Sequence, residues 1–196
     1  MPRTAHKITA EDIMPPAKYE AERKALRAAM LPVKKNRRMS VGPYATFYFE
    51  NYDTMWLQVQ EMLRIEKGGD EQIPGELEAY NPLIPQGAEL IATLMLEIED
   101  ANRRDTELRK LGNVEETVSL ALGDDVIKAT PTEYEDRTTP DGKTSSVHWL
   151  RFVFTPEQVA AFKAGARAVL QVEHRNYGHM AVIPPEVRAE LAKDFS

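Results

Sequence analysis

The chain has 196 residues, with 25 Lys and Arg against 31 Asp and Glu, and its net charge at pH 7 is −6. It contains no cysteine, which excludes disulfides, thiol nucleophiles and any iron–sulfur cluster held by the chain's own thiolates. A hydrophobic share of 42% is typical of a globular protein. No apolar run approaches the ~20 residues that span a bilayer, and the first residues lack a signal-peptide core. We therefore expect a cytoplasmic protein that makes no membrane contact.

The charge is unevenly distributed. Residues 1–38 carry ten basic and four acidic side chains, a net charge of +6, whereas the other 158 residues carry −12. Four closely spaced cations are the candidates for partner binding: Lys34, Lys35, Arg37 and Arg38. The acidic remainder disfavours nucleic acid as a partner, and cations at the end of a helix are the simpler explanation. Alternatively, the basic segment docks on the acidic remainder, within one chain or between two copies in a homo-oligomer.

The first half of the chain predicts two helices and a strand. Helix formers dominate residues 17–30, and Pro32 is expected to end this helix. Residues 45–50 alternate as a strand does. Residues 55–66 form an amphipathic helix, with Gln58, Gln60, Glu61 and Arg64 on its polar side. Glu66 falls within the apolar arc, where it either frays into solvent or pairs inside; the glycines that follow favour fraying.

The second half of the chain is rich in predicted strands. We expect strands at 90–99, 117–122, 126–130 and 167–174, and a β-hairpin with arms 134–138 and 144–154 around the turn at Pro140-Asp141-Gly142. Helices are predicted at 76–80, 100–111, 155–165 and 184–195. The predicted fold is α+β, a mainly antiparallel sheet of about six strands with packed helices. The predicted segments are a helical N-terminal segment (1–37), an α+β core domain (38–177) and a C-terminal helical extension (178–196).

Two histidines stand out because strand alternation turns them toward the apolar face. These are His148 and His174. With carboxylates such as Glu61 and Glu66, they are candidate ligands for iron, manganese or zinc. The alternative is that each is a core or edge histidine hydrogen-bonded to the backbone. This alternative is favoured because no short motif such as HExxH fixes two ligands on one element.

Several segments together resemble an uncharacterised bacterial family. They are Lys7-Ile-Thr, QVQEMLR at 58–64 with Glu66, YNPLIP at 80–85 and SSVHWLRF at 145–152. Over residues 6–177 the chain resembles "domain of unknown function 3501". The family has Asp-His-Pro after the last strand, where this chain has Glu173-His174-Arg175, and residues after Tyr177 resemble an extension. The resemblance implies a gene context, because such proteins are commonly encoded beside rubrerythrin-like proteins and iron–sulfur oxidoreductase subunits.

Two functional hypotheses follow. The first is a non-catalytic accessory or binding protein that works with a redox partner, in peroxide defence or with an iron–sulfur oxidoreductase. It is favoured because the sequence has no GxSxG, P-loop or GxGxxG motif. The second is a small metalloprotein or metalloenzyme built on His148 and His174. A nucleic-acid binder that uses the basic group at 34–38 is a weaker third.

Overall fold

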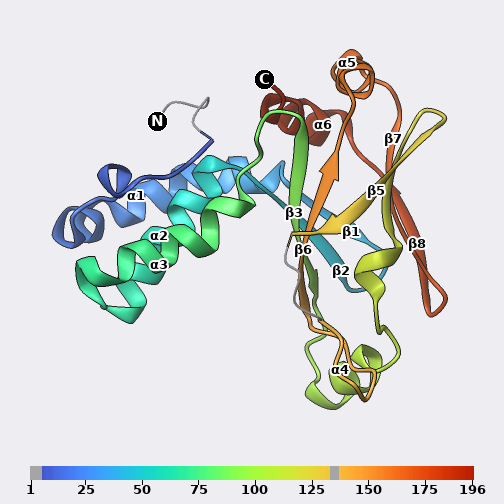
Figure 1. The fold of residues 1–196 in the computed structure, drawn as a ribbon, viewed down its shortest axis with the longest axis horizontal. Helices are drawn as coiled ribbons and strands as arrows, with labels where there is room; N and C mark the ends of the chain where they lie inside the picture. The colour runs from blue at the N-terminus through green and yellow to red at the C-terminus, as the bar shows by residue number, and fades with distance from the viewer. Residues whose placement is uncertain (1–5, 133–136) are drawn as a thin grey trace.

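The computed structural model describes residues 6–132 and 137–196. Figure 1 shows a curled sheet and, beside it, a layer of three helices: α1 (Pro16–Lys35), α2 (Tyr52–Glu66) and α3 (Ile73–Tyr80). Further helices lie at the two ends of the sheet, with α4 (Ala101–Leu108) at one end and α5 (Pro156–Ala164) and α6 (Pro185–Leu191) at the other. In the described parts of the chain, no helix has the length and apolar character needed to cross a membrane.

The sheet has eight strands within the described residues, all paired antiparallel in the order β1-β2-β3-β6-β5-β4-β7-β8. The α+β class and the antiparallel sheet are confirmed, but the expected number of about six strands is too low. The two unexpected strands are the edges, β1 and β8. Strand β1 alternates but is only 4 residues long, and β8 shows no clean apolar alternation. The strands are β1 (Arg38–Val41), β2 (Ala45–Glu50), β3 (Glu89–Leu96), β4 (Val118–Leu122), β5 (Asp125–Pro131), β6 (Val147–Val153), β7 (Ala168–His174) and β8 (Tyr177–Val182).

The sheet curls until its two edge strands meet. Tyr177, at the start of β8, donates its hydroxyl to the Val41 carbonyl at 2.7 Å and accepts from the Ala45 amide at 2.9 Å. Gly42 turns the chain between β1 and β2 with φ +75°, and a Cβ there would lie 2.6 Å from the ring of His179. Only glycine therefore fits this point, where β8 passes over the β1–β2 turn.

The region of the predicted hairpin has the expected turn but different pairing. Gly142 adopts φ +88°, the Thr139 amide donates to the Lys143 carbonyl at 2.9 Å, and Thr138 bridges Thr144. Residues 134–136 of the predicted first arm lie outside the described residues. Strand β6 pairs instead with β5 and β3, so the turn sits on a long excursion between β5 and β6.

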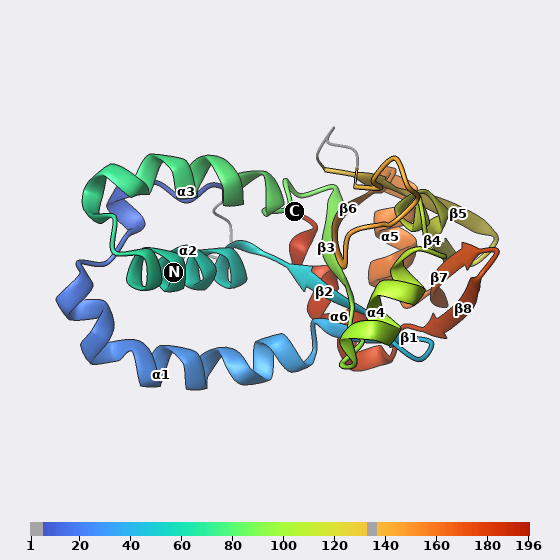
Figure 2. The ribbon, with the colours of Figure 1, turned by 90° about the horizontal axis from the view of Figure 1, so that it is seen from below.

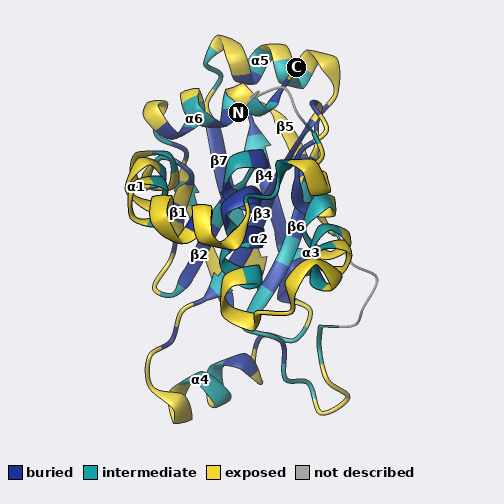
Figure 3. Ribbon diagram, turned by 90° about the vertical axis from the view of Figure 1, so that its left-hand side faces the viewer, coloured by how far each residue is buried: buried dark blue, intermediate teal, exposed yellow. Residues whose placement is uncertain are grey.

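Two apolar cores follow from this architecture. The larger core fills the inside of the curled sheet, and the smaller one lies between α1, α2 and the outer face of β3. Ile91 of β3 lies on the outer face of that strand and is fully buried, because the helical layer covers that face. Figure 3 shows buried strands behind helices whose outer sides are exposed. Helix packing thus buries β3 on both faces.

Helix α1 is longer than predicted. It runs through Pro32 to Lys35, and Asn36 follows it with its amide near the Pro32 and Val33 carbonyls. A proline removes one amide donor but not the carbonyls ahead of it, so one exposed turn can continue past it. Figure 2 shows α2 lying between α1 and α3, and residues of α2 contact both neighbours. The division of the chain into three segments stays a prediction; residues 177–182 of the last two segments form β8.

Candidate functional site

His148 lies on β6 and is 2% exposed. Its Nε2 bonds to the Ser145 carbonyl at 2.9 Å, and its Nδ1 lies 3.5 Å from the Glu115 carboxylate. Burial lowers the pKa of His148 to about 4, which keeps the ring neutral at pH 7. The space beside the ring, next to Trp149, measures only about 10 Å³. The ring is therefore packed into the protein and has no room for a substrate.

His174 ends β7 in a different environment. Its Nδ1 accepts from the Asn176 amide at 3.2 Å. Burial lowers the pKa of His174, while a hydrogen bond with the Gly112 backbone opposes that shift. The hydrogen-bonding partners of His174 and His148 are different. Each imidazole is thus hydrogen-bonded to a backbone group close to it in the chain, that of Ser145 for His148 and that of Asn176 for His174.

The two candidate carboxylates lie in the helical layer. Glu61 accepts from Arg23 at 2.8 Å and from the Tyr19 hydroxyl at 2.5 Å, which joins α2 to α1. Glu66, at the end of α2, is exposed and accepts from Gln72 at 2.8 Å. Glu66 therefore faces solvent in the last turn of α2 and is not paired inside the protein. Within residues 6–132 and 137–196, no three His, Asp or Glu side chains are grouped so that they could hold a metal ion.

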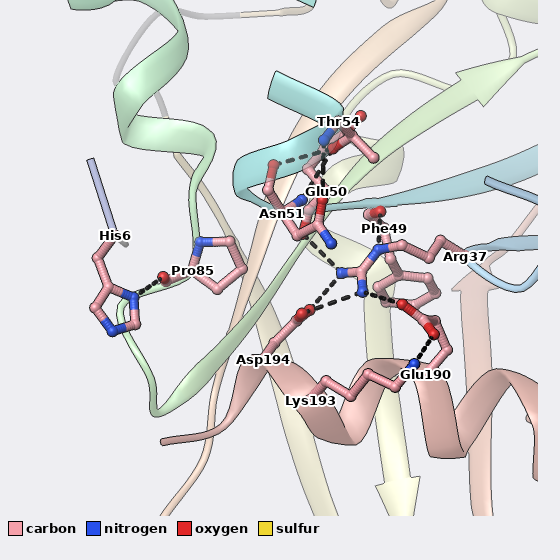
Figure 4. A network of polar contacts seen from close by, with 10 residues as sticks. All are labelled: His6, Arg37, Phe49, Glu50, Asn51, Thr54, Pro85, Glu190, Lys193 and Asp194. Atoms are coloured by element: carbon pink, nitrogen blue, oxygen red, sulfur yellow. Dashed lines mark hydrogen bonds and ion pairs between the residues drawn. The ribbon is translucent and has the colours of Figure 1, made fainter. Parts of the chain in front are cut away.

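Arg37 is a buried clamp. It is 1% exposed, and its guanidinium donates to the carbonyls of Phe49 and Glu50, each at 2.9 Å (Figure 4). It also pairs with Asp194, with one contact at 3.1 Å, and lies 3.7 Å from Glu190. Arg37 therefore does not belong to an exposed basic surface. It ties the chain between α1 and β1 to the C-terminal helical segment.

The other three partner-binding candidates remain at the surface. Lys34 and Lys35 are exposed in the last turn of α1. Arg38 is also exposed, although it pairs with Glu97 at 3.2 Å and lies over the ring of Tyr48. We call Lys34, Lys35 and Arg38 the basic surface. Its position at a helix C-terminus also agrees with the simpler dipole explanation.

A cavity that the sequence did not reveal lies in the helical layer. It measures about 1280 Å³ and opens between the start of α1, the end of α2 and the start of α3. We call it the helix groove. Its walls are mainly apolar, with Glu20, Arg64, Lys67 and Asp70 as the charged residues; the apolar ones include Ile13, Met14, Pro15, Pro16, Tyr19, Leu63, Ile73 and Pro74.

Gln60 lies in the wall of the helix groove and is 2% exposed. Its Nε2 has no hydrogen-bond partner among the described residues. The helical pattern of α2 assigns Gln60 to the polar side, and that assignment is wrong because α1 and α3 flank α2. The sequence contains one signal that could have indicated the helix groove, the thin apolar stripe of α1. Tyr19 lies on that stripe and lines the groove.

Three ionisable groups at or beside the helix groove, Tyr19, Glu20 and Glu61, have shifted pKa values. Arg23 and the Tyr19 hydroxyl hold the pKa of Glu61 at about 2. Burial and the neighbouring Glu61 carboxylate raise the pKa of Tyr19 well above its usual value of 10.0. Arg64 lowers the pKa of Glu20, to which it bonds at 2.6 Å. Of these groups, none is poised to exchange a proton near neutral pH.

Comparison with known proteins identifies the family. A sequence profile described as "Protein of unknown function (DUF3501)" matches residues 7–195. The chain belongs to this uncharacterised family. The expectation that the residues after Tyr177 are an extension beyond the family is wrong, because the family match continues to residue 195. A crystal structure of a protein of unknown function from Burkholderia pseudomallei K96243 is 35% identical, covers 97% of this chain and 100% of its own, and gives a TM-score of 0.90. No curated protein matches.

Proposed function

We propose that this DUF3501 protein is a non-catalytic binding protein and that the helix groove is its binding site. The observation that carries the proposal is the groove itself, about 1280 Å³ with mainly apolar walls. Ligand pockets commonly measure about 300–1000 Å³, are largely apolar and contain a few placed polar groups. The helix groove has this character, and its volume is enough for a small organic molecule.

Binding is favoured over catalysis by the state of the charged groups around the groove. General acid–base catalysis works best with a group whose pKa lies near the working pH. Glu61 is held ionised by Arg23, and Tyr19 is held protonated by burial. These contacts stabilise the joint between α1 and α2 rather than prepare a proton transfer. They support a passive binding site.

The redox part of the proposal comes from the gene context that the family resemblance implies. In that setting the protein would be an accessory to a rubrerythrin-like protein or an iron–sulfur oxidoreductase, with the metal or cluster on the partner. The basic surface of Lys34, Lys35 and Arg38 is the proposed contact for an acidic face of that partner. Self-association and a cytoplasmic location remain predictions.

Titration with the neutral dye Nile red tests the groove. We expect saturable dye fluorescence in the wild type and at least a ~10-fold loss of affinity in Leu63→Trp, which fills the cavity. Leu31→Trp is the matched control because Leu31 is 69% exposed and lies outside the groove. Ile73→Trp fills the groove from α3 and guards against a folding defect in one variant. Equal dye affinity in all four proteins would show that the groove is not the binding site.

A further inference from the structure

We infer that the helix groove takes an uncharged apolar molecule that carries a carbonyl group, and that Gln60 donates a hydrogen bond to this carbonyl. The inference rests on the proposed function and specifies the ligand of that site. Two independent observations carry it. One is the apolar groove, and the other is a buried amide donor in its wall without an acceptor.

The Gln60 amide is an isolated polar group in an apolar wall. Nearby donors have found acceptors: the Trp56 indole donates to the Asp12 carbonyl at 2.8 Å, and the Tyr19 hydroxyl donates to Glu61. A buried donor without an acceptor costs roughly 1–3 kcal/mol. The terminal torsion of glutamine is broad, so the inference requires only that this amide turn toward the cavity. A ligand acceptor at this point recovers the missing hydrogen bond.

The charges around the groove favour a neutral acceptor. Arg64 and Lys67, the two cations in the lining, are both exposed, and Arg64 is already paired with Glu20. Arg23 is already paired with Glu61, at the contact between α1 and α2. A carboxylate next to Gln60 would be buried without a countercharge, which is costly. A ketone, ester or amide carbonyl accepts the same hydrogen bond without that cost.

Isothermal titration calorimetry with 2-decanone and with decanoate on the full chain tests the ligand class. We expect 2-decanone to bind the wild type, and decanoate to bind at least ~10-fold more weakly. Gln60→Leu should weaken 2-decanone binding about 10-fold, which corresponds to about 1.4 kcal/mol. Gln58→Leu is the matched control, since it makes the same change on α2 at a residue outside the groove lining. Thermal melts provide a second readout: Gln60→Leu should keep or raise Tm because it removes an unpaired amide.

The possible failures are distinguishable. The ligand assignment is overturned if Gln60→Leu binds 2-decanone as tightly as Gln58→Leu does, or if decanoate binds as tightly as the ketone, while Leu63→Trp still abolishes binding. The proposed function itself fails if wild-type protein binds neither Nile red nor 2-decanone. A selective loss in Gln60→Leu with an unchanged Tm supports the inference.

Discussion

The buried imidazole of His148 shows how its surroundings determine the chemistry of a side chain. Its Nε2 donates a hydrogen bond to the Ser145 carbonyl. Because a neutral imidazole carries one proton, its Nδ1 carries none, and Nδ1 faces the Glu115 carboxylate. Charging this ring inside the protein is unfavourable because burial removes its hydration. The histidine therefore acts as a neutral packing group at pH 7, and protonation must destabilise the native state.

The pH dependence of the unfolding free energy should reveal the destabilisation that follows protonation of His148. The folded pKa of His148 is about 4 and its unshifted value is 6.5, so its contribution to stability is complete above pH 6.5 and is lost as the pH falls to 4. Burial raises the pKa of Glu50 and of Asp194, which act in the opposite direction. The difference in unfolding free energy between wild type and His148→Gln isolates the histidine. It should change by about 3 kcal/mol between pH 7 and pH 4 in urea titrations.

His179→Gln makes the same substitution at an exposed position and is the control for the exchange itself. A His148→Gln pH profile that runs parallel to that of the wild type would contradict the assignment of a neutral, buried ring.

Residue-level prediction succeeds where it depends on local periodicity. Strand alternation correctly turns His148 and His174 inward, because side chains alternate across a strand whatever the rest of the fold does. It fails for Gln60 and Arg37, whose burial is set by distant segments. Arg37 finds its carboxylate partner 157 residues away, at Asp194. No local pattern carries that information. From the sequence alone, the four cations at 34–38 are therefore all assigned to one exposed basic surface.

At the level of elements, the main joint is the one between the C-terminal segment and the sheet. Helix α6 and the following turn, which ends at Asp194, lie against the start of β1 and the end of β2 through Arg37 (Figure 4). The same turn donates from Lys193 to Glu190, which also faces the guanidinium. One arginine thus satisfies two backbone carbonyls and a buried carboxylate at once.

Removal of this clamp should destabilise the whole fold. Arg37→Ala leaves Asp194 buried without its partner, and we expect a loss of about 3–5 kcal/mol in urea unfolding. Arg38→Ala, next along the chain, removes only exposed contacts, the pair with Glu97 and the stacking on the Tyr48 ring, and should cost at most about 1 kcal/mol. The double variant Arg37→Ala, Asp194→Ala should recover part of the loss. Similar costs for Arg37→Ala and Arg38→Ala would contradict the buried clamp.

Element prediction is accurate in the interior of the sheet and poor at its edges. Strands such as β3 and β4 carry strong apolar patterns because they are enclosed. Most residues of edge strand β8 are exposed. Its position is fixed instead by the hydrogen bond of the Tyr177 hydroxyl to Val41 and by the close approach of His179 to Gly42. Such contacts depend on the curl of the sheet, which periodicity does not encode.

For the whole molecule, part of the uneven charge is paired within the chain. Basic residues of the N-terminal segment pair with acidic residues of the remainder, as in Arg23 with Glu61 and Arg37 with Asp194. The hypothesis that this segment docks on the acidic remainder is therefore supported within one chain. The basic surface, where Lys34 and Lys35 are exposed, remains available for another protein.

If the basic surface binds a redox partner, its charge must control the association. Reversal by Lys34→Glu and Lys35→Glu should then abolish co-purification with the proposed rubrerythrin-like or iron–sulfur partner. Raised salt should weaken the proposed complex, because exposed charges are screened over about 8 Å at 0.15 M. Lys128→Glu with Lys163→Glu makes the same change in net charge at exposed residues of β5 and α5. That control should retain the complex, since net charge is equal and only its position differs. Equal retention by both double variants would place the partner contact elsewhere on the molecule.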